Sequence, residues 1–406
     1  MPHSTTPWRY ILLLGACTAL PPLSIDMALP AISQLGGALH STSAAAAQSI
    51  SLFILGFVLG PLLFGPLSDR IGRRPILLVG LALFTLAGLA CTLAPNMPVL
   101  LVSRLLQGAA AGAAAAMPVA IVRDAFSGQQ GRALQSSLVA INNVAPLLAP
   151  LLGAAILAFS DWRAIYAALV LAGLALLVAA KGILHESHPP QARRQQALIA
   201  TYRQVLGNRR FTLCALIQAL NFAGMFAYIT ASPLVFMEGL GMSSQGFAVL
   251  FAVTALGTLG GSWLNNRLVH AGWSETRLIG ISLLASLGSS LGLVLLATFG
   301  TAPLLGLAAL VVVSNLCTGL VMPNATHLSL EQLAHTAGAG AALLRAIQMA
   351  GGALASLLVG HFYDGHSAHA MAWVMLGCAA LALLCFACGI RALAGAPPPA
   401  HSAGAP

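Results

Sequence analysis

The sequence predicts an all-α membrane protein with twelve transmembrane helices arranged in two halves of six. Of the 406 residues, 58% are hydrophobic and only 7% are charged, whereas soluble domains carry about a quarter charged residues. Twelve apolar runs are each long enough to cross a bilayer, which takes roughly 20 residues. One long polar connection, residues 185–210, divides these runs into six and six.

Each apolar run is expected to be a helix, because lipid offers no hydrogen-bond partners to the backbone. The first run is too long, and too polar at Asp26, for a cleavable signal peptide. The spans expected in the first half are 10–29, 48–64, 76–94, 99–122, 134–159 and 164–184. Those expected in the second half are 211–236, 246–268, 278–299, 303–328, 337–362 and 371–390.

The chain therefore divides into four parts. Residues 1–184 form an N-terminal six-helix bundle, 185–210 a cytoplasmic linker, 211–392 a C-terminal six-helix bundle and 393–406 a cytoplasmic tail. The tail is so rich in Pro, Gly and Ala that we expect it to be disordered. A weak internal match, in which Asp69-Arg70 is echoed 197 residues later by Asn266-Arg267, fits a duplicated six-helix unit.

Basic residues set the expected orientation. With the N-terminus inside, fifteen of the eighteen Lys and Arg residues fall in cytoplasmic segments, so both termini are expected in the cytoplasm. The net charge of +9 is then loop charge rather than a surface for nucleic acid. Arg104 and Arg345 fall inside spans, and the sequence assigns no role to Arg345.

Enzyme chemistry finds no support in the sequence. The seven cysteines all lie in apolar runs, and the C-x-x-C pair of Cys385 and Cys388 has no His or acidic neighbour, so packing explains these residues. No Walker loop, H-E-x-x-H or G-x-S-x-G is present. We therefore expect no cofactor, no bound metal and no catalytic residue.

The stretch GPLSDRIGRRP, residues 65–75, sets one acidic residue among three arginines and two glycines after the second span. An acidic residue adds little to orientation, so loop charge alone does not explain it. We interpret the stretch as an ionic latch between helix ends, with close helix approach at the first glycine and a sharp turn at the second. Its members are Gly65, Asp69, Arg70, Gly72, Arg73 and Arg74.

Three motifs together resemble those of one family. The pattern G-x-x-x-D-R-x-G-R-R at residues 65–74 resembles the loop signature of the major facilitator superfamily, which joins the halves on the cytoplasmic face and steadies the outward-open state. RLLQG at 104–108 resembles the fourth-helix signature of its drug/proton antiporters, whose arginine is implicated in proton coupling. Pro146, Pro150 and Gly153 resemble their fifth-helix antiporter signature.

Two further stretches resemble the bicyclomycin/chloramphenicol-resistance (Bcr/CflA) branch: SIDMALPAI at 24–32 and AYITASPLV at 227–235. The resemblance implies the major facilitator fold and a proton-coupled multidrug efflux antiporter. Such a protein would export small lipophilic antibiotics of the chloramphenicol or bicyclomycin type by alternating access. We expect it to act as a monomer in the bacterial inner membrane, with drug, protons and lipid as its partners.

Asp26 and Arg104 are the expected proton-coupling residues. Asp26 lies 16 residues after Tyr10, about 24 Å into the bilayer, and Arg104 lies seven residues after Met97, about 10 Å from the other face. In a core of roughly 30 Å these depths nearly coincide, so we expect the two side chains to pair directly or through water. The alternative is an Asp26 at the interface, near the outer end of its helix.

The substrate site is expected at the interface between the halves. Its candidate members are Asp26, Tyr228, Phe226, Asn221 and Asn142; the resemblance favours Tyr228, and packing is the alternative for the other three uncharged residues. A superfamily symporter that imports a small metabolite is the alternative function, but it would not be expected to carry the fifth-helix pattern. A membrane enzyme or receptor would need a catalytic constellation or a ligand domain.

Overall fold

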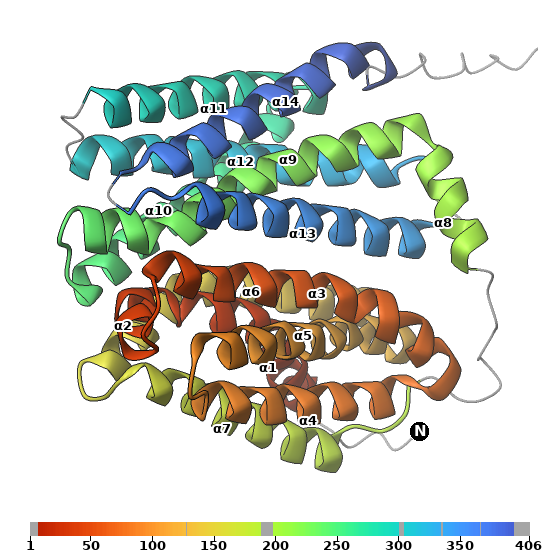
Figure 1. Cartoon of the computed structure of the whole chain (residues 1–406). Coiled ribbons are helices and arrows are strands. Elements are labelled where there is room, and N and C mark those ends of the chain that lie inside the picture. The colour runs from red at the N-terminus through yellow and green to blue at the C-terminus, as the bar shows by residue number, and fades with distance from the viewer. Residues whose placement is uncertain are drawn as a thin grey trace, which may run out of the picture.

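The computed structural model describes residues 7–126, 128–187, 198–299, 304–333, 336–365 and 367–393. Within these ranges the regular secondary structure is helical, and twelve spans are long and apolar enough to cross a membrane. Figure 1 shows two stacked halves, with residues 7–183 below and residues 198–393 above. The predicted twelve-helix fold in two halves is confirmed.

The first span is a broken helix. It consists of α1 (Pro7–Asp26), the 3-10 helix η1 (Leu29–Ala31) and α2 (Ile32–Ala38), so it extends beyond the predicted end at residue 29. Pro30 explains the break, because a helix continuing past Asp26 would need an N–H from residue 30 to reach the Asp26 carbonyl oxygen, and proline has none. The other helices of this half are α3 (Ser43–Ile71), α4 (Arg73–Thr92), α5 (Met97–Ala125), α6 (Gly128–Leu157) and α7 (Trp162–Ile183).

The second half begins with a short helix inside the predicted linker, α8 (Leu198–Gly207). Its spans are α9 (Arg209–Ser232) with the π-helix η3 (Pro233–Gly239), α10 (Ser244–His270), α11 (Glu275–Thr298), α12 (Leu304–Leu330), α13 (Ala337–Phe362) and α14 (His369–Leu393). The predicted disordered tail lies outside the described residues, apart from Leu393, which ends α14.

The halves meet along two helix pairs, α3 with α13 and α6 with α10 (Figure 1). We call the end of the bundle that carries α8 the linker end and the opposite end the far end. In the part of the bundle toward the far end, the buried Ser356 hydroxyl lies 2.6 Å from the hydroxyl oxygens of both Ser51 and Thr230. Nearer the far end, Gly360 lies against the Gln48 side chain. The two halves are therefore in contact on the far-end side.

Candidate functional site

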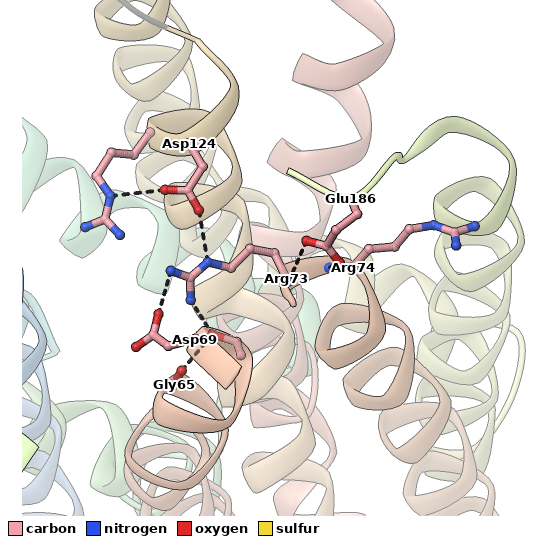
Figure 2. Close-up of polar contacts among 8 residues, drawn as sticks. Gly65, Asp69, Arg73, Arg74, Asp124 and Glu186 are labelled. Atoms are coloured by element: carbon pink, nitrogen blue, oxygen red, sulfur yellow. Dashed lines mark hydrogen bonds and ion pairs between the residues drawn. The ribbon is translucent and has the colours of Figure 1, made fainter. Parts of the chain in front are cut away.

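Arg73, the first residue of α4, is the centre of the latch (Figure 2). Its guanidinium pairs with Asp69 at 2.6 Å and with Asp124 at 3.1 Å, and also donates to the Ser68 hydroxyl. The Arg73 side chain is 6% exposed, so its charge is removed from water and is balanced by these two carboxylates. The predicted latch is thus an ion network that joins the ends of α3, α4 and α5.

Two acidic residues of this network were missed by the sequence reasoning. Asp124 lies in the last turn of α5, and Glu186 follows α7. The Glu186 carboxylate accepts hydrogen bonds from the backbone N–H groups of Arg73 at 2.9 Å and Arg74 at 3.3 Å, a favourable place for an anion at a helix N-terminus. The sequence did offer one signal, which is that the chain has only nine acidic residues. Three of them, Asp69, Asp124 and Glu186, contact Arg73.

Of the remaining predictions for the latch, one is confirmed and others are wrong. Gly72 has a φ of 122°, so the predicted sharp turn is confirmed. Close helix approach at Gly65 is wrong, because a Cβ there would meet nothing within 4 Å. Asp69 lies within the last turn of α3 rather than after its end, because the helix runs on past the apolar stretch to Ile71. Arg70 is exposed and takes no part in the ion pairs among the described residues.

The linker lies beside this network. Tyr202 belongs to α8, and burial, followed by the negative charge of Asp69, raises the pKa of its hydroxyl. The Arg123 guanidinium, 3.6 Å from Asp124, also packs against Gly338 near the start of α13. The latch is therefore an assembly of the first half whose edge lies near the linker and touches the second half.

Asp26 is 4% exposed and ends α1 at the break in the first span. Among the described residues, no hydrogen bond or ion pair engages its carboxyl group, and η1, just after Asp26, packs against α10 of the second half. Asp26 lies well inside its span, 18 residues after the first residue, Trp8, and 12 residues before the last, Ala38. The break therefore holds a buried carboxyl group next to the second half.

Arg104 lies at the depth that the sequence predicted, but it forms no direct ion pair with Asp26. Its fully buried guanidinium donates to the Ser24 carbonyl oxygen at 3.0 Å and to Gln107 Oε1 at 2.8 Å. Its positive charge also lies over the Phe53 ring, 4.3 Å from the centroid. Ser24 is in the last turn of α1, where carbonyl groups lack partners within the helix. Arg104 thus holds the backbone beside Asp26.

The fifth-helix motif packs against the same break. Pro146, Pro150 and Gly153 all lie in α6, and a Cβ on Gly153 would collide with the backbone carbonyl of Met27. Only glycine lets α6 approach the residue that follows Asp26 so closely. The motif and the buried carboxyl group are therefore parts of one structural unit.

The candidate substrate residues occupy different surroundings. The Tyr228 hydroxyl bonds Thr254 Oγ1 at 2.7 Å, and its ring stacks on Phe251, so Tyr228 is packed between α9 and α10. Phe226 is buried against Phe222. Asn221 is buried, and its side-chain oxygen has no partner among the described residues. The remaining candidate of this group lies in the first half: Asn142, in α6, is half-buried.

Comparison with known proteins places the chain. The model of the Major Facilitator Superfamily matches residues 14–356. An uncharacterized MFS-type transporter, YdgK of Bacillus subtilis (strain 168), is 32% identical, with 86% of this chain and 87% of the relative covered. A bicyclomycin resistance protein homolog of Haemophilus influenzae is 28% identical, with 93% and 95% covered. Multidrug resistance protein D of Escherichia coli (strain K12) is 28% identical, with 86% and 87% covered.

Solved structures agree on the fold. A D-xylose–proton symporter superposes with a TM-score of 0.69 at 18% identity, covering 93% of this chain and 97% of the symporter. A bacterial homolog of the human lysosomal transporter Spinster superposes with a TM-score of 0.72 at 15% identity, covering 96% and 98%. With twelve spans in two halves, a charged loop network and a family match over most of its length, the chain belongs to the Major Facilitator Superfamily of membrane transporters.

Proposed function

We propose that this chain is a proton-coupled multidrug efflux antiporter of the Bcr/CflA type in the bacterial inner membrane. It exports small lipophilic antibiotics, like chloramphenicol or bicyclomycin, with both termini in the cytoplasm. Relatives named for bicyclomycin and multidrug resistance, each aligned with most of this chain, support drug efflux. The observation that carries the proposal is the buried carboxyl group of Asp26 at a helix break between the halves.

Asp26 suits a proton carrier because its charge depends on access to water. A carboxyl group enclosed in protein ionises only where water, a donor or a cation compensates the lost hydration. Asp26 would therefore take up a proton when the site opens to one side of the membrane and release it when the site opens to the other. Arg104 fixes the Ser24 carbonyl and Gly153 fixes the position of Met27, so both neighbours of the break are held while Asp26 changes state.

Alternating access requires a site that is closed at one end and reachable from the other. The hydroxyl cluster of Ser51, Thr230 and Ser356 joins the halves toward the far end. A cavity of about 690 Å³ lies at the linker end, which we assign to the cytoplasm. This cavity, lined by the second half, would let a substrate enter that half from the cytoplasmic side.

Transport into proteoliposomes tests the proposal. Vesicles buffered at acidic pH inside and diluted into alkaline medium without ATP should accumulate labelled chloramphenicol, because protons leaving the lumen drive drug inward. Vesicles with Asp26→Asn should lose this gradient-driven uptake. Glu238→Gln changes an acidic residue of η3 and is the matched control that should retain uptake.

The direction of coupling separates the proposal from its alternative. A proton symporter would accumulate its substrate only with the acidic side outside. Uptake that follows that opposite gradient, requires ATP or follows sodium alone would contradict antiport.

A further inference from the structure

The linker-end cavity of about 690 Å³ has no part in the proton site described above. Its walls come from α9, α12 and α13, all in the second half, and combine apolar with polar side chains, among them Met322, Leu330, Gln218, Gln348 and Arg345. This volume lies within the range of ligand pockets, roughly 300–1,000 Å³. α13 also packs against α3, so the cavity's wall borders the interface between the halves (Figure 1).

Four of the lining residues form a chain of polar contacts. Thr326 Oγ1 donates to Gln218 Oε1 at 3.3 Å, and Gln218 Nε2 lies 3.5 Å from Gln348 Oε1. The Gln348 amide group in turn lies 3.7 Å from the Met322 sulfur. Both glutamines are almost fully buried within transmembrane segments. Buried amide side chains cost free energy in a transmembrane segment unless they are hydrogen-bonded, and these contacts supply the bonds.

Arg345 supplies the charge. It lies eight residues after the start of α13, about 12 Å into the helix, and one turn before Gln348 on the same face. Its side chain is exposed toward the cavity. Within the described part of the chain, no ion pair or hydrogen bond engages its guanidinium.

The acidic residues around the cavity are already engaged with other side chains. Glu331 pairs with Arg210 at 2.9 Å, and Glu275 lies 2.9 Å from the His327 ring nitrogen. Neither carboxylate is in an ion pair with Arg345. The cavity thus presents a guanidinium within a transmembrane segment whose planar donors match a carboxylate, sulfonate or phosphate.

We infer that this cavity binds the anionic group of transported molecules that carry one, with Arg345 as its counter-ion and the two glutamine amides beside it. This inference rests on the proposed function for the direction of transport, but binding itself needs no gradient. It adds a second substrate class to the uncharged antibiotics proposed above, namely lipophilic molecules that carry an anionic group. An anionic phospholipid headgroup shares that chemistry, and the experiment separates the two sources.

The test compares two probes that differ by one charged group. 8-Anilinonaphthalene-1-sulfonate carries a sulfonate, and N-phenyl-1-naphthylamine is its uncharged counterpart. Each is titrated into full-length protein in phosphatidylcholine nanodiscs, with the fluorescence of empty nanodiscs subtracted. Wild type should bind the sulfonate more tightly than the uncharged probe, and Arg345→Gln should weaken sulfonate binding about 10- to 100-fold while leaving the uncharged probe unchanged. Arg345→Lys should recover part of the loss.

Arg267→Gln is the matched control, because Arg267 stacks on Trp263 in α10 and does not line the cavity. Equal binding of the two probes by wild type would overturn the inference without any variant having to fold. Sulfonate binding that is unchanged in Arg345→Gln would also overturn it. If phosphatidylglycerol in the nanodiscs removes the Arg345-dependent binding, the occupant is a lipid headgroup and the substrate assignment fails. None of these outcomes depends on gradient-driven chloramphenicol transport. The proposal of anion binding at Arg345 can therefore fail while that of proton-coupled efflux stands, and the reverse.

Discussion

The two halves place opposite charges at equivalent positions of the linker end. In the first half, Arg73 begins α4 and pairs with Asp124 in the last turn of α5. In the second, Glu275 begins α11 and pairs with His327 in the last turn of α12. The side chains of Arg73 and Asp124 are 6% and 15% exposed, whereas those of Glu275 and His327 are 25% and 63% exposed.

This difference in burial between the two pairs indicates different roles for the two halves. A buried charge that loses its partner is strongly destabilising, whereas an exposed pair contributes about 0–1 kcal/mol. We infer that the ion network fixes the linker end of the first half, which also holds the proposed proton site. The second half leaves its linker end open around a cavity, where Arg345 is the counter-ion that we propose for anionic substrates.

The largest expected effect comes from breaking the two pairs in parallel. Arg73→Ala should lower the free energy of unfolding by about 3–5 kcal/mol, because it leaves Asp124 and Asp69 without their shared cation. His327→Ala should cost about 1 kcal/mol or less. Thermal unfolding in detergent measures both. Similar losses for the two variants would remove the contrast between the halves.

The next largest effect is expected from replacing one glycine in each half, Gly153 in α6 and Gly288 in α11. Gly153→Ala should destabilise the protein by about 1–3 kcal/mol, because the new methyl group meets the Met27 carbonyl. Gly288→Ala in α11 is the control, since a Cβ there meets nothing within 4 Å and alanine favours a helix. Its melting temperature should stay level or rise. If both variants melt like wild type, the close packing of α6 on the break is not needed.

Asp69→Asn should act on transport more than on stability. The Asp69 side chain is 41% exposed, and losing its charge loosens Arg73 without leaving a buried anion. We expect gradient-driven chloramphenicol uptake to fall several-fold while drug binding in detergent is retained. Asn266→Asp changes the echoed position of the second half, which is exposed, and should leave uptake unaltered. Binding that collapses together with uptake would argue against a latch.

The smallest expected effect concerns the hydroxyl cluster toward the far end. Ser356→Ala removes the hydroxyl that contacts both Ser51 and Thr230, at a cost of about 1 kcal/mol for each hydrogen bond. The far end should open more often, so a membrane-impermeant maleimide should react a few times faster with Gln48→Cys in a cysteine-free background. Ser289→Ala, which loses only a bond within α11, is the control. Unchanged labelling would mean that the cluster does not hold the far end closed.

The spans were predictable because length and hydropathy are local properties of a segment in lipid. The break after Asp26 also had a local signal, since Pro30 lies four residues later. The contacts of the site were not local. Arg73 meets Glu186 across 113 positions, and Arg104 reaches Ser24 across 80. Comparing the depths of Asp26 and Arg104 in the bilayer correctly predicted that Arg104 lies beside the break. Depth alone could not show that Arg104 donates to the Ser24 carbonyl oxygen rather than to the Asp26 carboxylate.

Proton release on drug binding tests the central claim, that Asp26 carries the proton, most directly. Purified wild-type protein in weakly buffered detergent should release protons when chloramphenicol is added, across a series of starting pH values. Asp26→Asn should release none while folding and reaching the membrane normally, and Glu238→Gln should behave like wild type. Release that persists unchanged in Asp26→Asn would show that another group carries the proton and that Asp26 is a packing residue.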